Sequence, residues 1–128
     1  MLATASRIAS ELEARVLAKG DRVLLWGENS PEWVAAFWGC VLRGAVVVPM
    51  DRIAAPDFAR RVGDQVQAKL AIGSRQQVEQ LSGISALVFE SFADVLPRHP
   101  AAEYRLPELR RSDPLQIIFT SGTTAEPK

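Results

Sequence analysis

The sequence contains one cysteine and one histidine, Cys40 and His99, among its 128 residues. A single cysteine excludes an internal disulfide, and the two residues together are too few for a Cys/His metal site. We therefore assign no metal ligand and expect a reducing, cytoplasmic compartment. Cys40 lies within an apolar helical pattern and has no activating neighbour, so we expect a buried side chain without chemistry.

The chain also lacks an excess of charge of either sign, because 15 Lys and Arg residues balance 15 Asp and Glu residues. This balance offers no electrostatic attraction for nucleic acid or an anionic membrane. The longest apolar run, residues 45–50, is far shorter than the ~18 residues that a membrane span requires. No apolar signal sequence, repeat or low-complexity tract is visible. We expect no nucleic-acid partner and no membrane span.

Short apolar runs and amphipathic segments alternate along the chain. Four runs indicate buried strands, because each is too short for a helix and is apolar on both faces. They cover residues 22–26, 45–50, 69–73 and 84–89. Strands separated by helices imply right-handed crossovers, so we predict a single α/β domain with a mostly parallel sheet and helices on both faces.

The first helix is predicted over residues 4–19. Ile8, Leu12 and Val16 recur every four residues on one face, and Gly20 follows as the expected C-terminal stop. A further helix is predicted over residues 74–82, and one helical turn over 91–96.

Two other helices have clear starts. Ser30 can cap a helix whose first position is Pro31, and Gly44 closes it. Pro56 begins the next helix in the same way. Their apolar stripes are Trp33, Phe37 and Val41 in the first and Phe58, Val62 and Val66 in the second.

Prolines after residue 96 predict a connecting loop through residue 111. His99 lies in this loop without a carboxylate nearby in the sequence, so we expect an exposed side chain rather than a catalytic base.

The last twelve residues, 117–128, change abruptly from apolar to polar. Ile117, Ile118 and Phe119 suit a buried strand, after which come hydroxyls, a glycine and the cation of Lys128. Such a loop suits a polyphosphate, although a polar surface turn has the same composition. The spacing does not fit the Walker A pattern.

The order Phe-Thr-Ser-Gly-Thr-Thr-x-x-Pro-Lys over residues 119–128 resembles the phosphate-binding signature of adenylate-forming enzymes. This superfamily includes acyl-CoA synthetases, peptide-synthetase adenylation domains and luciferases. The segments 20–23, 28–33 and 44–49 also resemble the opening of an acyl-CoA synthetase, in the same order. Ala125 departs from the usual glycine, and a non-glycine residue in a left-handed conformation costs about 1 kcal/mol or more.

The resemblance implies an AMP-forming ligase of fatty acid metabolism that uses ATP, Mg²⁺ and coenzyme A to activate a carboxylic acid. It assigns no catalytic residue to this chain, and it assigns ATP phosphate binding to these residues: Thr120, Ser121, Gly122, Thr123, Thr124 and Lys128. Residues 1–128 would then form the N-terminal portion of a larger AMP-binding domain, inactive alone. The alternative is a free-standing α/β module that binds a nucleotide or partner without chemistry, and that forms a homodimer through exposed sheet surface.

Overall fold

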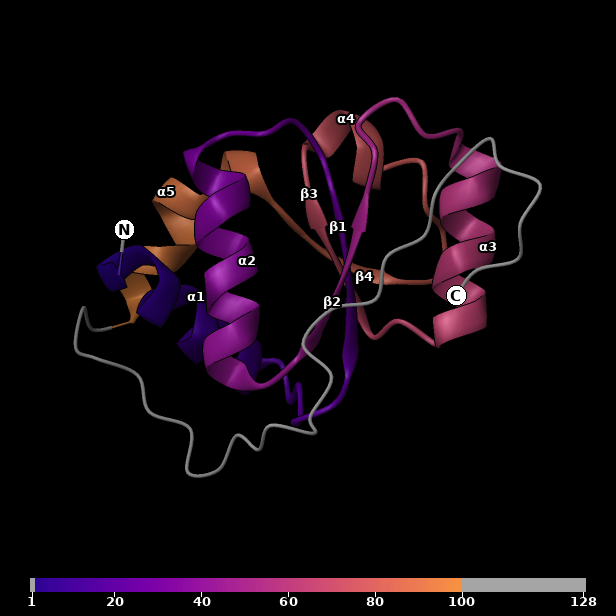
Figure 1. Ribbon diagram of the computed structural model, residues 1–128. Helices are drawn as coiled ribbons and strands as arrows, with labels where there is room; N and C mark the ends of the chain where they lie inside the picture. The colour runs from indigo at the N-terminus through magenta and orange to yellow at the C-terminus, as the bar shows by residue number, and fades with distance from the viewer. Residues whose placement is uncertain (1, 100–128) are drawn as a thin grey trace.

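The computed structural model describes residues 2–99. The strand and loop predicted over residues 117–128 lie outside the described residues, as does most of the connection that precedes them. Within the described part, four parallel strands form one sheet in the order β2-β1-β3-β4 (Figure 1). The strands are β1 (Arg22–Trp26), β2 (Val46–Met50), β3 (Leu70–Gly73) and β4 (Ser85–Val88). The predicted parallel α/β sheet is confirmed.

The strand β1 lies at the centre of the sheet. Val23 is in register with Val47 of β2 on one side and with Leu70 of β3 on the other. All three side chains are buried. Side chains on both faces of these strands are covered, which explains why each strand is apolar without alternation.

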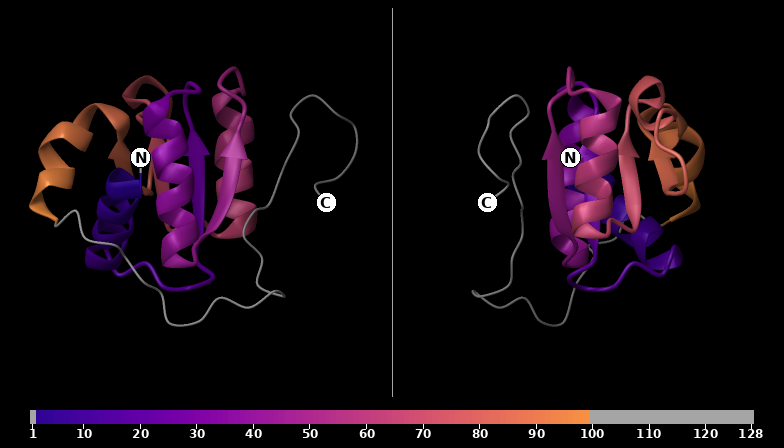
Figure 2. Two further views of the ribbon diagram at one scale, coloured as in Figure 1. Left: turned by 60° about the vertical axis from the view of Figure 1, so that its left-hand side comes forward. Right: turned by 90° about the vertical axis from the view of Figure 1, so that its right-hand side faces the viewer.

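Helices cover both faces of the sheet (Figures 1 and 2). On one face lie α1 (Leu2–Ala14), α2 (Pro31–Arg43) and α5 (Phe92–Val95), followed by the short 3₁₀ turn η2 (Leu96–Arg98). On the other face lie α3 (Pro56–Val66) and α4 (Arg75–Val78). A second 3₁₀ turn, η1 (Phe89–Ser91), follows β4. None of these helices is both long and apolar enough to cross a membrane.

The helix α2 begins and ends as predicted. The Ser30 hydroxyl accepts a hydrogen bond of 3.1 Å from the Trp33 amide, and Gly44 takes a left-handed conformation with φ 80°. Its most buried residues, however, are small ones, including Gly39 and Cys40, because α1 packs closely against it. A Cβ at Gly39 would lie 2.5 Å from the Ile8 side chain.

The predicted apolar stripe of α2 is consequently only partly buried. Trp33 and Phe37 stack with ring centroids 5.8 Å apart at the edge of the core, and Trp38 is 49% exposed. Cys40 is fully buried as predicted, and burial raises the pKa of its thiol to about 12. The thiol therefore remains protonated and unreactive at neutral pH.

Three helices end in the same backbone motif. In α1, the Leu17 amide donates to the Leu12 carbonyl and the Val16 amide to Glu13, which is the Schellman pattern. The equivalent left-handed residue is Gly44 after α2 and Gln67 after α3. The predicted extension of α1 to residue 19 was wrong, because the chain turns at Val16, which has φ 66° and an 85% exposed side chain.

The helix α4 is also shorter than the predicted segment of residues 74–82. After Val78, the amides of Gln80 and Leu81 bond three residues back rather than four, so the helix gives way to turns. This bend places Leu81 against the core cluster that α3 covers.

His99 is not the exposed loop residue that the sequence predicted. Its Nε2 lies 2.7 Å from Oε1 of Glu11 in α1, and its side chain is only 18% exposed. The other oxygen of Glu11 accepts a 2.7 Å hydrogen bond from Nε of Arg15. The Arg15 guanidinium in turn donates to the Ala86 carbonyl of β4. This Glu11–Arg15–His99 cluster joins the first helix to the last described turn.

Replacing Val16 by glycine should stabilise the fold. A β-branched residue is strained at positive φ, and this side chain is too exposed to contribute much burial. We expect Val16→Gly to raise the free energy of unfolding by about 0.5–1 kcal/mol, measured by urea denaturation. Val16→Ala removes nearly as much of the side chain but keeps a Cβ, so it should raise the free energy of unfolding by less. A loss of stability in Val16→Gly would contradict this account.

The Glu11 carboxylate should make stability depend on acid pH. Burial alone raises its pKa, but hydrogen bonds and charges from His99 and Arg15 outweigh burial and leave the pKa below its ordinary value of 4.5. The native state therefore binds fewer protons than the unfolded state, and stability is lost as pH falls through this range. We expect the stability difference between wild type and Glu11→Gln to shrink below about pH 4.5. Glu13→Gln, an exposed change on the same helix, should leave the pH profile unaltered.

Candidate functional site

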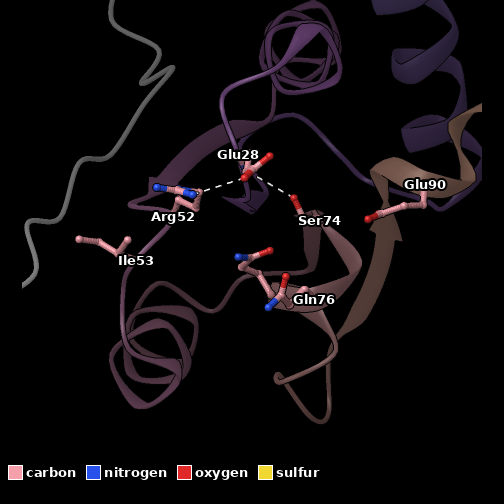
Figure 3. A pocket seen from close by; sticks show the side chains of 7 residues that line it. Glu28, Arg52, Ile53, Ser74, Gln76 and Glu90 are labelled. Atoms are coloured by element: carbon pink, nitrogen blue, oxygen red, sulfur yellow. Dashed lines mark hydrogen bonds and ion pairs between the residues drawn. The ribbon is translucent and has the colours of Figure 1, made fainter.

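The carboxyl ends of the four strands meet at one edge of the sheet. The chain leaves β1 toward α2 on one face and leaves β3 toward α4 on the other. Neighbouring strands whose connections diverge in this way create a switch point, where ligands of open parallel sheets usually bind. A pocket of about 370 Å³ lies at this edge (Figure 3).

Each strand contributes to this carboxyl-edge pocket. Glu28 follows β1, Ser74 begins the segment after β3, and Glu90 follows β4. The remaining lining residues are Arg52 and Ile53 after β2, and Gln76 and Gln77 in α4.

Hydrogen bonds hold the loops of the pocket together. Arg52 Nη1 lies 3.4 Å from Oε1 of Glu28, and the Glu28 amide donates to the Ser74 hydroxyl at 3.3 Å (Figure 3). The Arg75 amide donates to the Glu90 carboxylate at 2.9 Å. Because the Arg52–Glu28 pair is largely exposed, it contributes little to stability.

Two glycines let the central loops approach each other. A Cβ at Gly73 would lie 1.8 Å from the Trp26 carbonyl oxygen, and one at Gly27 would lie 2.7 Å from the Ser74 amide nitrogen. The Ser74 amide donates to that same Trp26 carbonyl at 3.2 Å. The backbones at the carboxyl ends of β1 and β3 are therefore in close contact beside the pocket, and neither position admits a side chain.

The chemistry of the pocket favours a ligand with hydrogen-bond donors. Two carboxylates, Glu28 and Glu90, face a single cation, Arg52, which is already paired. Gln76 adds an exposed side-chain amide. This arrangement suits hydroxyl, amide or amine groups and does not fit a triphosphate, which requires several positive charges. Residues 2–99 contain no cluster of carboxylate, histidine and cysteine side chains that could hold a metal ion.

The phosphate-binding residues that the sequence predicted lie elsewhere in the chain. Thr120, Ser121, Gly122, Thr123, Thr124 and Lys128 all fall outside the described residues, as does Ala125. Conversely, none of the residues that line the carboxyl-edge pocket was predicted from the sequence as a ligand. A signal for them existed, because polar residues such as Glu28 and Ser74 come directly after predicted strands.

Comparison with known proteins identifies the family. A family model described as "AMP-binding enzyme" matches residues 1–128. The chain therefore belongs to the AMP-binding enzyme family, as its C-terminal motif predicted.

Several relatives share this sequence. The chain is 35% identical to a long-chain-fatty-acid–CoA ligase, FadD13 of Mycobacterium tuberculosis, over 139 aligned positions that cover all of this chain and 27% of the relative. It is 34% identical to a fatty acid–[acyl-carrier-protein] ligase, MmaC of Mycobacterium marinum, covering all of this chain and 26% of that protein. The chain thus spans about a quarter of the length of these relatives.

Solved structures share the fold. The inhibitor-bound N-terminal domain of FACL13 from Mycobacterium tuberculosis superposes with a TM-score of 0.84 at 30% identity. The match covers 98% of this chain and 34% of the other. The four-stranded parallel sheet is therefore part of the N-terminal domain architecture of adenylate-forming enzymes.

Replacing Gln77 by methionine should stabilise the protein. A buried acceptor without a partner carries a desolvation penalty, and methionine keeps the length of the side chain without that oxygen. We expect Gln77→Met to raise the free energy of unfolding by about 1 kcal/mol. The exposed Gln76→Met should change it by less than about 0.5 kcal/mol. A destabilised Gln77→Met protein would show that water or another group satisfies this oxygen.

Proposed function

We propose that this chain is part of an ATP-dependent carboxylic acid ligase. In the first step a carboxylate oxygen attacks the α-phosphorus of ATP, and an acyl adenylate forms as pyrophosphate leaves. In the second step a thiol attacks the acyl carbon, and a thioester forms as AMP leaves. The family match over residues 1–128 carries this proposal.

The acid and the acceptor thiol are proposed from the relatives. One relative is named as a ligase that joins long-chain fatty acids to CoA, and another as one that joins fatty acids to acyl-carrier protein. A fatty acid is therefore the first substrate to test. Coenzyme A and the phosphopantetheine thiol of a carrier protein are the two acceptors to compare.

Residues 120–128 would bind the β- and γ-phosphates of Mg·ATP. Thr120, Ser121, Thr123 and Thr124 supply hydroxyl donors, and Lys128 supplies a cation. Positive charge and hydrogen-bond donors stabilise the pyrophosphate leaving group as its charge develops. The carboxyl-edge pocket lacks this chemistry, which supports assigning phosphate binding to the C-terminal motif.

Residues 2–99 would serve as a frame for this loop. Their buried parallel sheet gives a rigid base, and their carboxyl-edge loops are fixed by hydrogen bonds. We propose that residues 1–128 alone do not turn over substrate, because they span only about a quarter of the relatives that carry the named activities.

Replacing Lys128 should impair adenylation. We expect Lys128→Ala to lower acid-dependent pyrophosphate release by about 100-fold or more, because the leaving group loses its cation. Lys69→Ala, which removes an exposed lysine before β3, should leave the rate unchanged. The measurement uses the protein produced from its gene, Mg·ATP and a series of fatty acids.

Two outcomes would contradict the proposal. Absence of pyrophosphate release with every acid tested would contradict the ligase assignment itself. Acid-dependent turnover by residues 1–128 alone would contradict only the proposed inactivity of the isolated chain.

A further inference from the structure

The helix α2 has no charged residue between its two ends. From Trp33 to Leu42 its sequence contains only apolar residues and glycine, and its charges, Glu32 and Arg43, lie in the first and last turns. A surface helix normally carries polar side chains on the side away from the core, whereas a helix that is apolar all round is buried on all sides. The composition of α2 is therefore that of an interior helix.

One side of α2 is nevertheless open in the described part of the chain. Its buried residues pack toward the sheet and α1, and no other described helix or strand lies over the opposite side (Figures 1 and 2). We call this side the outer face of α2. Its residues are spaced by three or four positions, so they share one side of the helix. They are Val34, Trp38, Val41 and Leu42, all partly or largely exposed.

The helix α3 shows the usual pattern in the same domain. Its buried residues face the sheet, and Arg60, Arg61 and Asp64 are exposed on its other side. The outer face of α2 instead presents an indole, because Trp38 is 49% exposed. An apolar surface of this kind, without charged residues, is typical of the centre of a protein interface.

Neighbouring aromatic rings hold Trp38 in place. Phe37 packs edge-to-face against Trp38 with ring centroids 5.5 Å apart, and Trp33 stacks on Phe37 at 5.8 Å. Trp33 and Phe37 are in turn packed against the buried core. The exposed indole is therefore ordered before any partner binds, which lowers the entropy cost of association.

We propose that two copies of this chain form a dimer through the outer face of α2, with Trp38 at its centre. Tryptophan is the residue type most enriched among those that dominate interface energies. Because the face is uncharged, two identical faces can meet without repulsion between like charges, as a twofold interface requires. This dimer is independent of the proposed ligase activity.

The charges at the ends of α2 favour an antiparallel arrangement of the two helices. Glu28 and Glu32 lie at its amino end, whereas Arg43 and Lys19 lie at its carboxyl end. Lys19 is near this end because the next residue donates its amide to the Gly44 carbonyl at 2.9 Å. An antiparallel pair places each acidic end beside a basic end and also aligns the helix dipoles favourably.

This arrangement specifies which residues meet. Trp38 of one copy lies against Trp38 of the other at the twofold axis. Val34 of one copy then lies opposite Leu42 of the other, because both are four residues from Trp38. The contact is small, since the 13 residues of α2 span only about 20 Å. We therefore expect a weak dimer, with a Kd of about 10–500 µM.

The test is sedimentation equilibrium of the 128-residue chain from about 10 µM to 1 mM, a range that spans the expected Kd. No nucleotide or acid is present, so the result does not depend on catalysis. The wild-type chain should show a reversible monomer–dimer equilibrium. Trp38→Glu would set two carboxylates against each other at the twofold axis and should raise the Kd about tenfold or more. Trp38→Phe keeps an aromatic ring and should be intermediate.

A second exposed apolar side chain provides the matched control. Ile53 is 81% exposed in the loop after β2, away from the outer face of α2. Ile53→Glu makes the same kind of change as Trp38→Glu and should dimerise like wild type. Circular dichroism of each variant checks that the fold is retained.

Cross-linking tests the antiparallel arrangement. A mixture of Val34→Cys and Leu42→Cys chains should be joined by a short bismaleimide more efficiently than either variant alone. Cys40 gives no background in this experiment, because its side chain is fully buried.

Four results would overturn the proposal. A chain that stays monomeric up to about 1 mM would exclude the dimer. If that monomer also protected Trp38 from a soluble quencher, the outer face would be covered within one chain. A dimer that survives Trp38→Glu, or that is lost in Ile53→Glu, would place the interface elsewhere. Equal cross-linking of Val34→Cys alone and of the mixture would exclude the antiparallel arrangement. If Trp38→Glu does not fold, Trp38→Phe decides in its place.

Discussion

The parallel pairing of β1 with both β2 and β3 is the constraint on which the rest of the structure depends. It places β1 at the centre of the sheet and requires the crossover helices α2 and α3 to lie on opposite faces. At the carboxyl end it also brings the Ser74 amide to the Trp26 carbonyl, an approach that only a glycine at position 73 permits. The layers, the core and the carboxyl-edge pocket all follow from this arrangement.

The Glu11–Arg15–His99 cluster adds a long-range tie to this frame. It links α1 to the turn after α5, across 88 positions of sequence, and Arg15 extends it to the backbone of β4. Burial makes this carboxylate costly to leave unpaired, whereas the exposed Arg52–Glu28 pair is screened by water. The cluster occupies both oxygens of Glu11, one with Arg15 and the other with His99.

The two hollows of this domain differ in chemistry. The carboxyl-edge pocket is rich in oxygen acceptors and has one paired cation, whereas a second hollow, lined by residues of α1, α2 and α5, is mainly apolar. Neither carries the positive charge that a triphosphate requires. In the proposed ligase, the described frame and the C-terminal phosphate loop therefore have separate tasks. The frame gives rigidity, and residues 120–128 supply charge and hydroxyls to the leaving group.

The sequence alone determined the local elements and the family. The Val46–Val48 run indicated a strand, and Ser30 and Pro31 predicted the start of α2. The motif at 119–128 predicted the AMP-binding family. Each of these predictions depends only on residues that are neighbours in the sequence. Tertiary structure alone decided which residues far apart in the sequence come into contact. His99 finds its carboxylate on another helix, and the carboxyl-edge pocket draws one residue or more from the end of every strand. No periodicity within a segment encodes such contacts, since they depend on the order of strands in the sheet and on close packing between helices.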